Sequence, residues 1–163
     1  MTREERQIKI DRMRYTKDKL SANLVIGAIV LDALYFVSIY QTDVGTWYYN
    51  WIIGASVIYN LLFMLTAFLA SEGVKSRKTG YTGLLTGIGL MQLVRIFYLP
   101  AKAHAAEVVI QEVAYPVMTD GKYAYAVACL AISGVCCVIA AITSFINNKT
   151  LANYLRATEA EKQ

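Results

Sequence analysis

Four long runs of apolar residues dominate the chain, and shorter polar stretches separate them. The runs cover residues 20–40, 51–71, 81–100 and 123–146. Since roughly 20 helical residues cross the ~30 Å hydrocarbon core of a bilayer, each run is long enough to span a membrane. Outer-membrane barrels instead show alternating segments of about 10 residues. The pattern predicts an all-α integral membrane protein whose four transmembrane helices form an antiparallel up-down bundle.

Composition supports a membrane protein rather than a water-soluble domain. Apolar residues make up 56% of the 163 residues, and the mean hydropathy is +0.40, which is unusually high for a soluble globular domain. The first run begins late, is long, and is not followed by a small-residue cleavage site, so we do not expect it to be a removable signal peptide.

The basic residues are divided unequally between the two sides of this topology. Seven precede the first run, three lie in the turn at 72–80 and three follow the last run, whereas the loop at 41–50 has none and the loop at 101–122 has two. By the positive-inside rule, both termini are expected in the cytoplasm and the protein in the plasma (inner) membrane. Aromatic residues that suit the headgroup region mark the opposite boundary: Tyr40, Trp47, Tyr48, Tyr49, Trp51, Tyr98, Tyr115, Tyr123 and Tyr125.

Both ends of the chain are predicted to be helical. Residues 1–19 are expected to form a basic amphipathic helix, because Thr2 and Glu5 have the spacing of a capping box. This helix either lies on anionic lipids of the inner leaflet or extends into solvent. Residues 147–163 are expected to continue the last span as a cytoplasmic helical tail. The basic side chains expected to face lipid are Lys9, Arg12, Arg14, Lys17 and Lys19.

The loop at 101–122 is long for a connection without structure of its own, so we expect a small folded element there. Residues 101–106 favour helix, and residues 108–113 favour extended structure or burial. If the chain recognises something outside the cell, we expect this loop to do so, but packing over the ends of the helices explains it equally well.

An arginine inside the third apolar run needs a partner, because an unpaired charge at the bilayer centre costs at least ~2.5 kcal/mol. Asp32 in the first run is the candidate. Counted from the inner ends of their spans, Asp32 and Arg95 lie roughly 16 and 21 Å deep, a difference that an arginine side chain covers. The rival explanation is that Arg95 reaches the outer headgroups along its own stem. The predicted intramembrane polar cluster also includes Tyr35, Asn60 and Gln92.

Small residues at four-residue spacing predict where helices pack closely. In lipid, the contact between helices depends on van der Waals packing, which small side chains permit. The sequence does not distinguish a seam inside one chain from a seam between chains. The predicted seam residues are Gly83 and Gly87 in the third run and Cys129, Ser133, Cys137 and Ala141 in the fourth.

Few residues of the chain are candidates for catalysis or metal binding. His104 with Glu107 makes at most half of a metal site, and a surface pair is the better interpretation. The cysteines all lie in the fourth run and form no C-x-x-C pair, so packing is the better interpretation for them as well. The sequence contains no motif of a hydrolase, protease or nucleotide-binding protein. We therefore expect no enzyme activity, no cofactor or metal, and no nucleic-acid partner.

Two functions are compatible with these features. The first is a non-enzymatic membrane protein that acts by packing, as an accessory subunit of a membrane complex such as a transport system, or as a homo-oligomer. The second is a small transporter or channel subunit that uses the polar cluster as a substrate, ion or proton site. A sensor that uses the outer loop as a receptor is a third class, but no motif favours it.

Overall fold

The computed structural model describes residues 3–13, 15–40, 51–110 and 113–160. Predictions for Thr2, Arg14 and the loop at 41–50 lie outside the described residues. The described helices are α1 (Arg3–Arg12), α2 (Lys19–Tyr40), α4 (Trp51–Lys75), α5 (Gly80–His104) and α6 (Asp120–Ala160).

Helices α2, α4, α5 and α6 are each long and apolar enough to cross a membrane. The four predicted spans are thereby confirmed as helices, and the chain is an integral membrane protein. The predicted span at 123–146 and the predicted tail form one helix of 41 residues. At 1.5 Å per residue this helix is about 60 Å long, twice the thickness of the hydrocarbon core.

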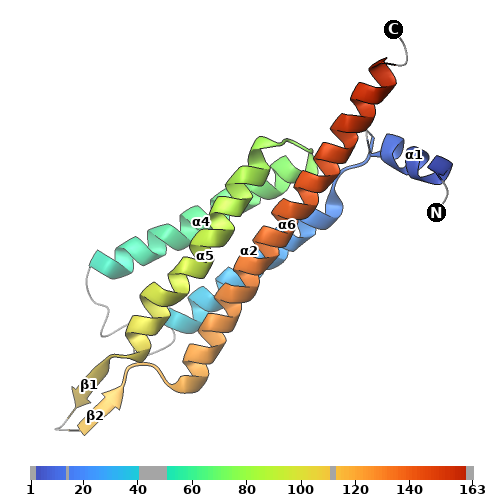
Figure 1. Cartoon of the computed structure of the whole chain (residues 1–163). Coiled ribbons are helices and arrows are strands. Elements are labelled where there is room, and N and C mark those ends of the chain that lie inside the picture. Colours follow the sequence, from blue (N-terminus) through green and yellow to red (C-terminus); the bar gives the residue numbers. More distant parts are fainter. Residues whose placement is uncertain (1–2, 14, 41–50, 111–112, 161–163) are drawn as a thin grey trace.

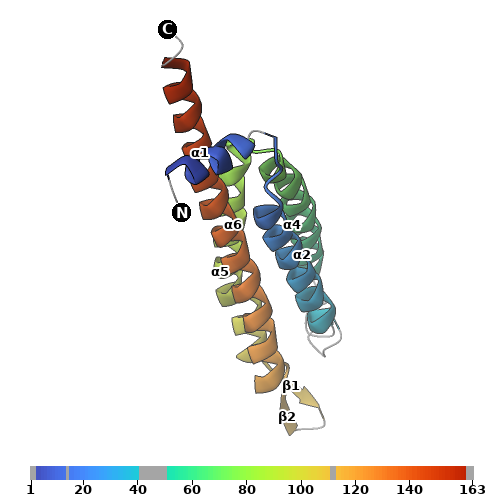
Figure 2. The same ribbon diagram turned by 90° about the vertical axis from the view of Figure 1, so that its right-hand side faces the viewer.

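The four long helices pack in a cycle. Helix α2 contacts α4 and α6, and α5 contacts the same two helices. Helix α4 diverges from α5 toward its Trp51 end (Figure 1). Helix α1 contacts α6 and lies with the end of α6 at one end of the molecule, whereas the two strands lie at the other (Figures 1 and 2).

A β-hairpin forms the folded element predicted between the third and fourth spans. Strands β1 (Glu107–Ile110) and β2 (Val113–Pro116) pair antiparallel, with Glu107 opposite Pro116 and Ile110 opposite Val113. The amide of Val117 donates a hydrogen bond of 3.0 Å to the carbonyl of Ala106. This bond continues the pairing of the two strands by one residue toward the helices. The all-helical prediction thus holds for the spans, and the loop between the third and fourth spans adds two short strands to it.

The helix expected over the first 19 residues is shorter than predicted and ends at Arg12. The hydroxyl of Thr16 donates to the carbonyl of Arg12 at 3.0 Å, which satisfies one of the carbonyls left open at the helix end. Asp18 then begins α2 as its N-cap, because its Oδ1 accepts the amide of Ser21 at 3.2 Å. One hydrogen bond at the end of α1 and another at the start of α2 therefore mark the break between the two helices.

The turn between α4 and α5 closes with paired backbone hydrogen bonds. The amide of Arg77 donates to the carbonyl of Val74, and the amide of Lys78 donates to that of Gly73, which is the Schellman arrangement. Arg77 occupies the left-handed position with φ 58°, where glycine is usual. Its Nε also donates to the carbonyl of Thr16 at 3.1 Å, so this turn is tied to the α1–α2 connection.

Helices α5 and α6 approach each other closely at two glycines, Gly89 and Gly134. A Cβ on Gly89 would lie 3.1 Å from the carbonyl oxygen of Gly134, and a Cβ on Gly134 would lie 3.0 Å from that of Gly89. A methyl group at either glycine would press on the backbone of the facing helix, so α5 and α6 pack tightly at this point.

The predicted small-residue seam divides into a packed half and an exposed half. All four predicted residues of the fourth span, Cys129, Ser133, Cys137 and Ala141, are buried. Gly83 and Gly87, however, are exposed, and nothing lies within 4 Å of a Cβ built on either one. Within one chain Gly83 and Gly87 lie outside the buried face of α5, which passes through Gly89 instead. A role for these two glycines between chains stays a prediction.

We expect Gly89→Ala to lower the free energy of unfolding by about 1–3 kcal/mol, because the new methyl group forces two touching helices apart. Gly87→Ala is the matched control, since it adds the same group to the same helix in open space. Thermal unfolding of the purified protein in detergent measures both. Equal melting temperatures for the two variants would contradict the close contact at Gly89.

Candidate functional site

The polar residues inside the membrane lie on faces that are otherwise apolar. The buried face of α2 carries Val25, Ala28, Asp32 and Tyr35 at helical spacing. On α5, the buried face brings Gln92 and Arg95 toward the same region. Asp32 lies about 20 Å along α2 from Lys19, and Arg95 about 22 Å along α5 from Gly80. The two charges therefore occur at one level of the bundle.

Asp32 and Arg95 are in direct contact. An Nη1 of Arg95 lies 3.2 Å from Oδ1 of Asp32, and the exposed fractions of the two side chains are 8% and 0%. The side-chain amide of Gln92 donates to the same Oδ1 at 2.8 Å. Because α2 and α5 each pack mainly against α4 and α6, these contacts join two helices across the middle of the bundle. The alternative in which Arg95 extends to the headgroups is not the arrangement observed.

Two tyrosine rings enclose the guanidinium of Arg95. Its Cζ lies 4.6 Å from the ring centroid of Tyr35 and 4.7 Å from that of Tyr59, both within the range of cation–π attraction. Tyr35 belongs to the predicted cluster, but Tyr59 does not. A signal for Tyr59 was present, because it is an aromatic residue within a span rather than at the membrane boundary where tyrosine is common.

Asn60, which follows Tyr59 on α4, is buried but makes none of the hydrogen bonds predicted for it. Its exposed fraction is 1%, and neither polar atom of its side chain has a hydrogen-bond partner among the described residues. The prediction that Asn60 satisfies the ion pair is therefore wrong. Tyr59, the preceding residue on α4, takes the position next to Arg95, and successive residues on a helix point in different directions.

Several polar atoms of the cluster have no partner within the described part of the chain. They are Oδ2 of Asp32, Oε1 of Gln92 and one guanidinium nitrogen of Arg95, in addition to the Asn60 amide. Buried polar atoms are normally satisfied, and each exception requires a reason. The cluster thus combines a neutralised charge pair with unused donors and acceptors, a combination that fits either a structural clasp or a polar binding site.

A second group of polar contacts connects the helices elsewhere, and the sequence analysis did not identify it. Ser133 on α6 donates to the carbonyl of Ala28 on α2 at 2.9 Å, and Ser71 on α4 donates to that of Ala22 at 3.3 Å. The buried Asp18 also accepts a hydrogen bond of 3.2 Å from Asn147 on α6. Such bonds between helices are a main source of attraction in lipid.

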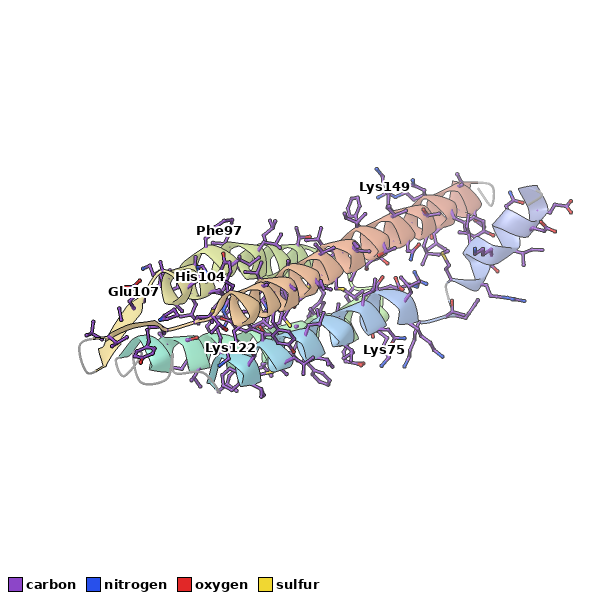
Figure 3. All side chains as sticks on the ribbon, turned by 90° about the horizontal axis from the view of Figure 1, so that it is seen from below. Lys75, Phe97, His104, Glu107, Lys122 and Lys149 are labelled. Atoms are coloured by element: carbon purple, nitrogen blue, oxygen red, sulfur yellow. The ribbon has the colours of Figure 1, made fainter. Side chains whose placement is uncertain are left out.

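The remaining predicted residues lie away from the cluster. His104 is hydrogen-bonded through Nε2 to Oδ1 of Asp120 at 2.9 Å rather than to Glu107. This hydrogen bond connects the end of α5 with the start of α6. Lys75 and Lys149 lie toward the α1 end, and His104, Glu107 and Lys122 toward the hairpin end (Figure 3). The residues predicted to face lipid that are described, Lys9, Arg12, Lys17 and Lys19, are all exposed.

Comparisons with known protein families, with curated proteins and with solved structures give no match to this chain. The interpretation of the cluster therefore depends on its own geometry.

We expect Asp32→Arg and Arg95→Asp each to lose most of the folded protein, because each places two like charges together in the buried cluster. The double reversal restores an opposite pair and should recover part of the loss. The yield of monodisperse protein and its melting temperature in detergent measure this. Glu107→Arg, at an exposed position, controls for charge reversal alone. A double variant no better than either single variant would show that the pair does not stabilise the bundle.

Asn60→Leu and Gln92→Leu should have opposite effects on the melting temperature. Leu at position 60 replaces an amide that is buried without partners, so stability should stay equal or rise by about 1 kcal/mol. Leu at position 92 removes the 2.8 Å hydrogen bond to Asp32, so stability should fall by about 1–3 kcal/mol. A large loss in Asn60→Leu would show that the Asn60 amide is satisfied in the membrane.

Proposed function

We propose that this chain is a non-enzymatic membrane subunit that acts by packing, either within a larger membrane complex such as a transport system or in a homo-oligomer. The observation that carries the proposal is the enclosed ion pair. Asp32 and Arg95 neutralise each other across the centre of the bundle, and Tyr35 and Tyr59 cover the guanidinium. A polar layer of this kind sets how the four helices meet, which is what a packing subunit requires.

The length of α6 supports an assembly role. A helix of 41 residues is far longer than a membrane span, so a substantial part of it extends beyond the bundle at the α1 end. Helix α1 packs against α6. Together they offer a helical arm outside the hydrocarbon for contact with a partner.

We further propose an up-down arrangement with both termini in the cytoplasm and the hairpin outside the plasma membrane. The basic residues of α1, of the α4–α5 turn and of the end of α6 support this orientation through the positive-inside rule. Tyr98, Tyr115 and Tyr125, all about half exposed, lie near the hairpin, where aromatic residues suit the outer headgroups.

A second candidate is a small transporter or channel subunit that uses the polar layer as its substrate, ion or proton site. The unpartnered atoms favour it, because Oδ2 of Asp32 and Oε1 of Gln92 are acceptors without a partner among the described residues. An ionisable group inside a membrane is frequently part of an ion or proton path.

Purification in mild detergent from the native membrane, followed by native mass spectrometry, tests the first candidate. We expect a stable assembly that contains additional chains or several copies. Asp32→Asn should weaken the bundle but leave that assembly detectable. The same preparations are placed in liposomes, and proton and ion flux are measured.

Flux from the purified chain alone, lost in Asp32→Asn, would favour the transporter. A monomer without partners in native membranes would contradict the packing role. Cysteine labelling from each side, with Lys122→Cys and Lys149→Cys compared, tests the orientation independently.

A further inference from the structure

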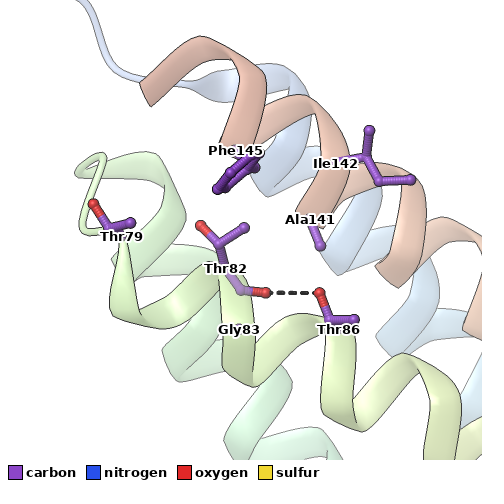
Figure 4. A pocket seen from close by; sticks show the side chains of 7 residues that line it. All are labelled: Thr79, Thr82, Gly83, Thr86, Ala141, Ile142 and Phe145. Atoms are coloured by element: carbon purple, nitrogen blue, oxygen red, sulfur yellow. Dashed lines mark hydrogen bonds between the residues drawn. The ribbon is translucent and has the colours of Figure 1, made fainter. Parts of the chain in front are cut away.

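A groove lies between the first turns of α5 and the facing part of α6. Its volume is about 340 Å³, and its walls include Thr79, Thr82, Thr86, Ala141 and Phe145 (Figure 4). Gly83 also lines it and leaves open space where a side chain would stand. Since α5 and α6 are membrane spans, this groove opens toward lipid near the membrane surface at the α1 end.

The groove is confined to the end of the bundle. Farther along the exposed face of α5, the large side chains of Leu90 and Val94 project outward. A neighbouring transmembrane helix needs a long row of small residues for close approach, and this face offers one only near Gly83 and Gly87. A flexible acyl chain needs only the short groove and then continues into the bilayer.

One buried hydroxyl in the groove needs an acceptor. Thr82 is 6% exposed, its side chain points toward Phe145 across the groove (Figure 4), and its Oγ1 has no partner among the described residues. Thr86, by contrast, donates to the carbonyl of Thr82 at 3.0 Å. Thr82 lies two residues from the start of α5, about 3 Å along the helix, near the level of the ester carbonyls of a phospholipid.

Two basic residues lie close in sequence to residues that line the groove. Lys78 precedes Thr79, and Lys149 lies one helical turn beyond Phe145 on α6. Both are exposed, and neither has an ion-pair partner within the described ranges. Unpaired lysines at the cytoplasmic surface of a membrane attract anionic headgroups.

We propose that the α5–α6 groove binds one acyl chain of an anionic phospholipid, with its phosphate held by Lys78 and Lys149 and an ester carbonyl accepting from Thr82. The apolar groove supplies contact area, and the two lysines supply selectivity for the charge of the headgroup.

The test titrates the full-length protein with phosphatidylglycerol and with phosphatidylcholine in detergent micelles, and counts retained lipid by native mass spectrometry. We expect one phosphatidylglycerol to be retained in preference to phosphatidylcholine. Gly83→Leu fills the groove and should weaken retention about tenfold, which corresponds to ~1.4 kcal/mol. Gly87→Leu, one turn along the same face and outside the groove, should retain lipid as the wild type does.

The double variant Lys78→Gln/Lys149→Gln should weaken retention of phosphatidylglycerol about 25-fold, at about fivefold for each lysine. Lys102→Gln/Lys122→Gln makes the same change of charge at the hairpin end and should have no effect. Equal retention by the two double variants, or equal loss in Gly83→Leu and Gly87→Leu, would overturn the proposal. A dimer disrupted by both leucine variants would assign this face to a second copy instead. Loss of lipid while the native assembly persists would leave the packing function in place.

Discussion

A charge inside hydrocarbon must be neutralised, and this requirement governs how the spans of this protein meet. Asp32 is short and fully buried, so it has no route to water. Arg95 is the charge that reaches it, and Gln92 holds the same carboxylate oxygen. Because α2 and α5 face each other across the bundle, any slip of one helix along the other would separate the charges, and an isolated buried charge is far more costly than a pair.

The remaining cohesion comes from contacts that do not depend on hydrophobicity. Lipid is as apolar as leucine, so helices gain little from burying apolar surface against one another. In this chain, Ser133 and Ser71 bond to backbone carbonyls of α2, and Asp18 connects α2 with α6. Gly89 and Gly134 allow direct backbone contact between α5 and α6. Polar bonds and close packing therefore hold the bundle together.

The coarse architecture could be predicted from the sequence because it depends on run length and hydropathy alone. The Asp32–Arg95 contact could be anticipated because helix rise places both residues at one depth. Depth alone did not show that Tyr59 rather than Asn60 lies next to Arg95, because depth does not determine which face of α4 meets α5. The α5 glycines show the same limit. The four-residue spacing of Gly83 and Gly87 predicted a packing seam there. The packed glycine is Gly89, which lies three residues from Gln92 and therefore on the same buried face of α5.

Local capping also escaped the sequence analysis. The Thr2–Glu5 spacing predicts where a helix begins but gives no end for it, so the break after Arg12 was missed. That break depends on Thr16, whose hydroxyl bonds to Arg12, and on Asp18, which bonds to Ser21. Threonine and aspartate are common in loops as well as at helix caps, so the sequence alone does not show that Thr16 and Asp18 act as caps.

Helix α6 has no glycine or proline after Gly134, so no hinge separates its buried half from its projecting half. A rod without a joint transmits tilt and rotation along its whole length. Any change in how α5 and α6 cross at their glycine contact would therefore move the tip of α6 at the α1 end through a larger arc than the movement at the crossing. The same rigidity works in reverse, so that a load applied to the tip would act as torque on the buried crossing.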